Sequence, residues 1–236
     1  MRHVALITAT FAVVCACTND PGVTGDAGPD VRPGDAGRDV DASPPVDAGG
    51  CAPGDVSSFS PNWVPPKPAS SACTQANIDQ YAKDCLDPQT GNTTACNAFQ
   101  TANKACVTCL VTPESATTYG AAISQANGVI SLNVGGCIAL LSGDLGASGC
   151  GAKYEANRQC AAAACDEPCP IPNGDDPAFQ KYLKCLTAAE KTSCKAYSAA
   201  VCPEPDAGAV AACSLNGASF VDNFKALAPI FCASGG

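Results

Sequence analysis

The density of cysteine in one part of the chain constrains its fold more than any other feature. Of the 18 cysteines, 16 lie between positions 51 and 232, about one residue in every eleven. This density is typical of exported domains that are cross-linked by disulfide bonds, and an even number allows every cysteine to pair. We expect disulfide bonds to use Cys51, Cys73, Cys85, Cys96, Cys106, Cys109, Cys137, Cys150, Cys160, Cys165, Cys169, Cys185, Cys194, Cys202, Cys213 and Cys232.

The segment before these cysteines contains no cysteine and is rich in small and acidic residues. Residues 18–50 hold seven Asp, seven Gly and five Pro, but no aromatic residue and no Leu, Ile, Met or Cys. Such a segment cannot bury enough apolar surface to offset the entropy that ordering would cost. We therefore expect a disordered acidic tether. Its irregular Asp-Ala-Gly repeats, at Asp26, Asp35 and Asp47, favour this reading over a calcium site.

The first residues read as an export signal. Arg2 precedes an apolar run that is too short to span a bilayer. The run ends in Val14-Cys15-Ala16-Cys17, which resembles the lipobox of bacterial lipoproteins. The resemblance covers only these 17 residues. It implies that residues 1–16 are a removed signal peptide and that Cys17 is lipidated, which anchors the chain to a membrane. Thr18 in place of Asp favours the outer membrane, and an ordinary secretory leader is the alternative.

These features divide the chain into four parts. After the signal peptide (1–16) and the lipidated cysteine with its linker (17–50), residues 51–72 form a proline-rich extended strap, and residues 73–236 form the cysteine-rich domain. The strap contains two large aromatic residues, Phe59 and Trp63. We expect both rings to pack onto the domain rather than face a partner, because exposed Trp is uncommon.

The fold class that we predict is mainly α, built from disulfide-stapled helical hairpins with one short β-hairpin insertion. Two stretches with similar sequences, within 73–110 and 170–202, suggest two related hairpins. The Cys-x9-Cys spacing at Cys96 and Cys150 resembles that of coiled-coil-helix proteins, although their paired motif is absent. The rise of 1.5 Å per helical residue predicts which cysteines face each other. The expected pairs are Cys85 with Cys96, Cys73 with Cys106 or Cys109, and, by analogy, Cys185 with Cys194.

Turn and cap signals place the remaining elements. Asn127-Gly128 between two apolar runs predicts the β-hairpin. Helices are expected over Cys137–Leu141, from about Gly151 to Cys165, after Asp175-Asp176-Pro177, and over Ser219–Phe231.

Catalytic side chains are scarce. The only histidine, His3, lies in the expected signal peptide, so the mature chain lacks histidine for catalysis or metal binding. The adjacent pairs Asp166-Glu167 and Asp175-Asp176 fit helix ends better than an acid–base pair. We therefore predict no enzyme and no cofactor, with a carboxylate-dependent hydrolase as a second alternative function.

Thiols offer one further chemistry. The Cys106-x-x-Cys109 motif ends an expected helix, where the helix dipole does not favour a thiolate. Cys160, Cys165 and Cys169 are close in sequence and could bind copper or zinc if reduced. Most other gaps are too long for a one-sided thiol array, so metal binding is the alternative function.

The net charge of −9 disfavours nucleic acid as a partner. The expected partners are a membrane, through Cys17, and an unidentified protein or cell-envelope component. The sequence thus predicts an anchored, exported, non-catalytic binding or structural domain.

Overall fold

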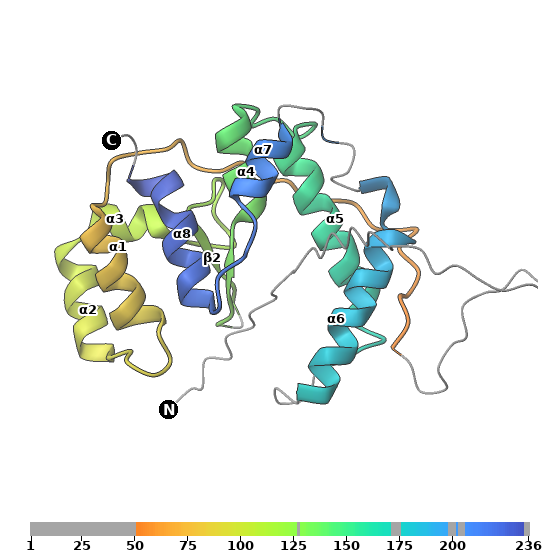
Figure 1. Cartoon of the computed structure of the whole chain (residues 1–236), viewed down its shortest axis with the longest axis horizontal. Coiled ribbons are helices and arrows are strands. Elements are labelled where there is room, and N and C mark those ends of the chain that lie inside the picture. Colours follow the sequence, from red (N-terminus) through yellow and green to blue (C-terminus); the bar gives the residue numbers. More distant parts are fainter. Residues whose placement is uncertain (1–50, 127, 171–175, 198–201, 203–205, 234–236) are drawn as a thin grey trace, which may run out of the picture.

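The computed structural model describes residues 51–126, 128–170, 176–197, 202 and 206–233. Cys17, the expected signal peptide and the tether lie outside these residues. The described part is dominated by helices, with a small three-stranded sheet (Figure 1). Its helices are α1 Gln75–Tyr81, the π-helix η1 Ala82–Leu86, α2 Thr93–Ala102, α3 Lys104–Leu110, α4 Val134–Ser142, α5 Cys150–Cys165, α6 Asp176–Lys191, the 3-10 turn η3 Lys195–Tyr197, α7 Asp206–Ala212 and α8 Phe220–Cys232.

The helices begin where the sequence supplies capping side chains. Asn92 accepts hydrogen bonds from the N–H groups of Thr94 and Ala95 and so caps α2. Ser219 caps α8 in the same way. Asn133 caps α4, which therefore begins three residues before the expected start at Cys137. The expected helices corresponding to α4, α5, α6 and α8 are confirmed, whereas α7 was not predicted.

The sheet contains the expected β-hairpin and one additional strand. β2 (Ala122–Ser124) pairs antiparallel with β3 (Ile130–Leu132), and Gly128 in the turn has a φ of 86°. Asn127 lies outside the described residues. β1 (Val111–Pro113) pairs parallel with β2 and directly follows α3. A three-residue strand continuous with a helix carries no alternation of its own, so the sequence did not reveal it.

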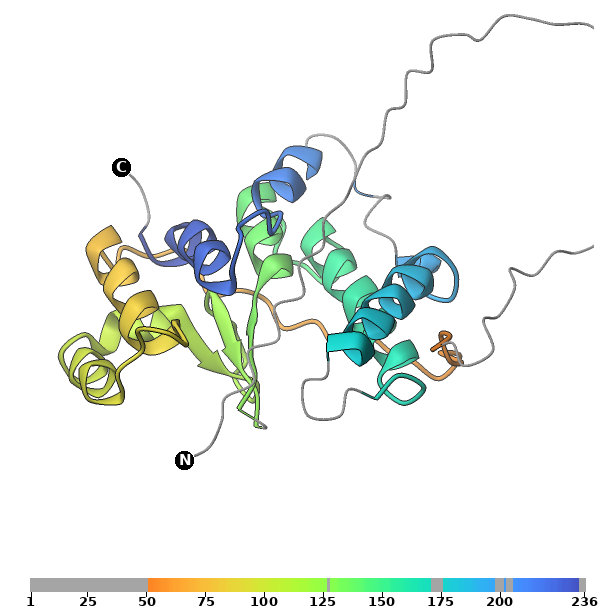
Figure 2. The same ribbon diagram turned by 60° about the horizontal axis from the view of Figure 1, so that its bottom comes forward.

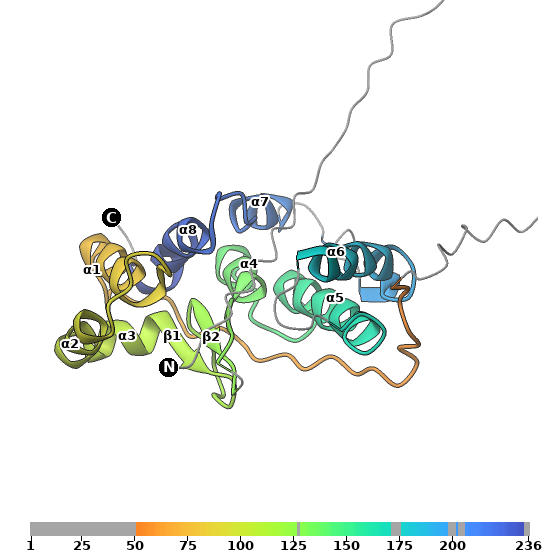
Figure 3. The same cartoon turned by 90° about the horizontal axis from the view of Figure 1, so that it is seen from below.

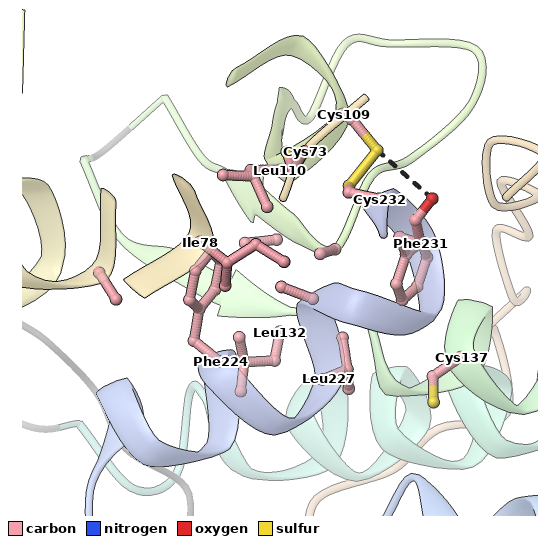
Figure 4. Packing of buried hydrophobic residues seen from close by; sticks show 14 of the residues in the cluster. Cys73, Ile78, Cys109, Leu110, Leu132, Cys137, Phe224, Leu227, Phe231 and Cys232 are labelled. Carbon is pink, nitrogen blue, oxygen red and sulfur yellow. Dashed lines mark hydrogen bonds between the residues drawn. A yellow bond between two sulfur atoms is a disulfide. The ribbon is translucent and has the colours of Figure 1, made fainter. Parts of the chain in front are cut away.

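One group of buried residues, which we call the large core, joins α1, η1, α2, α3, the sheet, α4 and α8. Phe224 and Phe231 of α8 are almost fully buried in it, together with Ile78 and Leu110 (Figure 4). Tyr81 stacks obliquely with Phe99 and with Phe224, at ring-centroid distances of 5.8 and 6.0 Å. Aromatic and branched side chains therefore fill this half of the molecule.

A second group, which we call the cysteine core, lies between α5 and α6. Its nine buried residues are five cysteines, three alanines and one leucine: Cys160, Ala161, Ala164, Cys165, Cys169, Cys185, Leu186, Ala189 and Cys194. The two helices lie side by side, apart from α1, α2 and α8 (Figure 2). The small residues let the two helices approach closely but offer little apolar area to bury.

The two cores meet where α4 crosses α5. A β-carbon on Gly151 would overlap the carbonyl oxygen of Gly135 and the side chain of Ala139. Glycine is therefore required here because the two helix backbones are in direct contact.

The strap, residues 51–72, runs along α5 and on to the sheet and α1 (Figure 3). Near its start, the Gly54 N–H donates to the carbonyl of Ala164 at 2.7 Å. Near its end, the Ser70 N–H donates to the carbonyl of Phe231 at 2.8 Å. The strap thus contacts both cores. Phe59 packs edge-on against Tyr197 at 5.5 Å, and this contact places its ring on the domain, as the sequence suggested.

Candidate functional site

All 16 cysteines of the domain form disulfide bonds in the structure, with Cα–Cα distances from 4.8 to 5.9 Å. Such distances are ordinary for disulfides. The pairs are Cys51–Cys169, Cys73–Cys106, Cys85–Cys96, Cys109–Cys232, Cys137–Cys213, Cys150–Cys202, Cys160–Cys194 and Cys165–Cys185.

Two of the three predicted pairings agree with the structure. Helix geometry correctly predicted Cys85–Cys96, and it predicted Cys73–Cys106 as one of two alternatives. The pairing of Cys185 with Cys194, expected by analogy, is wrong. Both cysteines bond instead to α5, because α6 packs against α5 and the residues directly after α6 form the short turn η3 rather than a second helix. The repeat seen in the sequence therefore does not mark a second hairpin with the same bonding.

The Cys106-x-x-Cys109 motif does not form a bond within itself. Cys106 bonds to Cys73 before α1, and Cys109 bonds to Cys232 at the end of α8. Cys109 Sγ also lies 3.5 Å from the carbonyl oxygen of Phe231 (Figure 4). In this structure the motif links two distant segments to α3, which is a cross-linking role.

Three sulfur atoms gather beside the cysteine core. The Sγ atoms of Cys51, Cys169 and Cys185 all lie within 4.8 Å of one another, because the Cys51–Cys169 bond contacts the Cys165–Cys185 bond. Three thiolates at this spacing would suit a soft metal ion. As disulfides, however, these sulfurs carry no thiolate charge.

A groove of about 290 Å³ lies between the strap, α5 and η3. Alanine side chains of α5 line its floor, and aromatic residues from the strap and from η3 line its sides. The lining residues are Pro61, Asn62, Trp63, Ala147, Ala152, Lys153, Ala156, Ala196 and Tyr197. Its volume is at the lower end of the range for small-molecule sites.

Hydrogen bonds hold the strap at one side of this groove. The N–H of Asn62 donates to Gln159 Oε1 at 2.9 Å, and Gln159 Nε2 donates back to the Asn62 carbonyl at 2.8 Å. The indole N–H of Trp63 donates to the carbonyl of Leu145 at 3.0 Å. The side of the groove formed by the strap is therefore fixed by three hydrogen bonds, each of which joins residues more than 80 positions apart in the sequence.

The charged groups near the groove differ in their pairing. Glu155 and Arg158, one turn apart on α5, form an ion pair at 3.1 Å. Lys153 lines the groove and is partly buried, but its ammonium group forms no ion pair or hydrogen bond with any described residue. The groove thus combines an apolar surface with one cation that has no ionic partner in the part of the chain that the structure describes.

A second hollow, between η1 and α8, is lined with acids, including Asp79, Asp84 and Asp87. The Thr90 hydroxyl donates to Asp87 Oδ2 at 2.7 Å, and this hydrogen bond, with that from the Gln89 N–H, lowers the pKa of the carboxyl. A general acid at neutral pH requires a raised pKa. Asp87 instead stabilises the turn that follows η1.

The adjacent acids singled out in the sequence are dispersed. Asp166 is exposed and accepts a hydrogen bond from the Tyr182 hydroxyl at 2.8 Å. Glu167 is exposed as well. Asp175 and the side chain of Asp176 lie outside the described residues. Asp166 therefore ties α5 to α6 through Tyr182.

Sequence reasoning did not find the groove. It singled out Trp63 as a packing residue of the strap, and nothing in the local pattern linked it to Lys153, 90 positions later. A possible signal was the lysine itself, which directly follows the small residues Cys150, Gly151 and Ala152 at the start of α5.

No protein-family model, curated protein or solved structure matches this chain. Among the described residues, no helix combines the length and the apolar character that crossing a membrane requires.

Proposed function

We propose that this chain is an exported lipoprotein whose cysteine-rich domain is a non-catalytic binding module, held at the outer membrane by a lipid on Cys17. The pairing of all 16 domain cysteines carries this proposal. Disulfides persist in oxidising compartments, and eight of them indicate that the domain folds outside the cytoplasm.

The arrangement of the bonds supports a scaffold role. Five bonds join segments more than 33 residues apart in sequence, and two of these span 118 and 123 residues. Cross-links of this kind stabilise a fold by restricting the unfolded chain. We include in the proposal that disulfide-stapled helical hairpins, α1 and η1 with α2, and α5 with α6, are the units from which the domain is built.

The groove supports binding rather than structure alone. Hydrogen bonds fix the strap side of the groove, and the Cys160–Cys194 bond joins α5 to the residue directly before η3. A site that is already ordered loses little entropy when a ligand binds. The Asp-Ala-Gly composition of residues 18–50 suits a spacer between the anchor and this module.

A mass measurement on chain extracted from native membranes tests the proposal. We expect no alkylation before reduction, 16 alkylated thiols in the domain after it, and the mass of a lipid on Cys17. The Cys17→Ser variant should lose the lipid and leave the membrane fraction, while its domain disulfides stay intact. Unmodified Cys17 together with a cleaved ordinary leader would contradict the anchor.

The sulfur cluster at Cys51, Cys169 and Cys185 favours one alternative, a site for copper or zinc in the reduced chain. The same measurement separates the two functions. Free thiols at these positions, with copper or zinc bound in the purified chain, would replace the scaffold by metal binding.

A further inference from the structure

The groove beside Trp63 is the strongest candidate for a specific ligand site, because its walls come from three separate parts of the molecule that cross-links and hydrogen bonds join. Trp63 belongs to the strap, Lys153 to α5, and Tyr197 to η3. The Tyr197 N–H donates to the carbonyl of Cys194, whose own side chain bonds to Cys160 of α5. The opposing sides are therefore fixed relative to the floor before any ligand arrives.

The chemistry of the lining restricts what can bind. Trp63 and Tyr197 offer aromatic surface, and Ala152 and Ala156 form a buried apolar floor. Aromatic rings favour flat apolar groups, which can stack on them or pack edge-on. The volume of about 290 Å³ suits one or two rings rather than a polymer.

The charge supplies the second restriction. The chain carries a net charge of −9, yet the one charged residue that lines the groove is a lysine without an ionic partner among the described residues. A partly buried cation attracts an anion more strongly than an exposed one, because less water screens it.

We propose that this groove binds a small aromatic carboxylate, with its ring between Trp63 and Tyr197 and its carboxylate at the Lys153 ammonium group. The inference rests on the binding function proposed above and gives the ligand class for it. The aromatic body takes up the apolar surface and the carboxylate neutralises Lys153. A neutral ring would not neutralise Lys153, and a small inorganic anion would leave the apolar lining of the groove exposed to water.

Trp63 provides a direct test, because it is the only tryptophan of the chain. The full chain, labelled with 5-fluorotryptophan and placed in lipid nanodiscs, should give one fluorine signal. Titration with 2-naphthoate should shift this signal in a saturable way, and empty nanodiscs correct for ligand taken up by lipid. The Lys153→Gln variant should bind about fivefold more weakly, the effect of one partly exposed ion pair.

Two controls make the result specific. Lys184→Gln removes an exposed lysine of α6 outside this groove and should bind 2-naphthoate as the unmodified chain does. The neutral 2-naphthamide should bind the unmodified chain about fivefold more weakly than 2-naphthoate does. It should bind Lys153→Gln and the unmodified chain with equal affinity.

The ligand class is wrong if the Trp63 signal does not move, if Lys153→Gln binds 2-naphthoate as tightly as the unmodified chain, or if amide and carboxylate bind equally. Such a failure, with all 16 domain cysteines paired in the mass measurement, would leave the scaffold function standing. Free thiols in that measurement would instead contradict the proposed function itself.

Discussion

The two cores of this domain are held together in different ways. The large core buries rings and branched chains, including Phe99, Phe220, Phe224 and Phe231. The cysteine core buries only cysteine, alanine and one leucine, and its aromatic neighbours, such as Phe59 and Tyr197, are only partly buried. Burial of a phenylalanine contributes about 1.5–3 kcal/mol, whereas an alanine contributes far less. The α5–α6 pair therefore depends on its cross-links for stability that α8 obtains from packing.

The largest effect should come from emptying the large core. Phe224 is fully buried and contacts Tyr81, so Phe224→Ala should lower the free energy of unfolding by about 3–5 kcal/mol. Guanidinium denaturation of the oxidised chain measures this. Phe59→Ala is the matched change beside the cysteine core, where the ring is only partly buried. Equal losses in the two variants would contradict the difference between the cores.

Removing a cross-link should have the next largest effect, and a local one. Cys165–Cys185 closes 20 residues, and the Cys165→Ala/Cys185→Ala pair should cost about 3 kcal/mol. Amide hydrogen exchange should quicken in α6 and stay unchanged in α8. The matched pair, Cys85→Ala/Cys96→Ala, should leave α1 and α2 more protected, because Tyr81 and Phe99 still pack there. Unchanged exchange in α6 would refute the dependence on cross-links.

The smallest effect concerns the polar contact between α5 and α6. Burial, and then the hydrogen bond to Asp166, raise the pKa of Tyr182 well above its ordinary value of 10. Because the folded-state pKa is the higher one, this stabilisation is complete below pH 10 and is lost as the pH rises above it. Tyr182→Phe should lower the free energy of unfolding by about 1 kcal/mol at pH 7. Above pH 10, this variant should lose less stability than the unmodified chain does. Thermal denaturation across this range measures both. Identical pH profiles would show that Tyr182 is not involved.

The sequence revealed local features of this fold better than distant ones. Cys85 and Cys96 flank a clear turn, so helix geometry alone predicted their bond. Cys109–Cys232 and Cys51–Cys169 join segments more than 100 residues apart, and no local pattern records such proximity. The error at Cys185 had the same origin, since the partner helix is α5 rather than the segment that follows.

The candidate site was out of reach of sequence reasoning for a related reason. Because the only histidine is His3, the sequence analysis considered cysteine rather than the common catalytic groups. The groove, however, requires Trp63, Lys153 and Tyr197 to meet, and this depends on the path of the strap along α5. That path is set by paired hydrogen bonds between Asn62 and Gln159, which are ordinary polar residues in the sequence.

Hydrogen exchange of the full chain, oxidised and after complete reduction, tests the difference between the two cores most directly. Mass spectrometry would follow peptides from α6 and from α8 in the same sample. We predict that reduction removes protection from α6 and leaves slow exchange in α8, whose rings remain packed around Ile78 and Leu110. Loss of protection in both helices to the same extent, or in α8 first, would contradict the account.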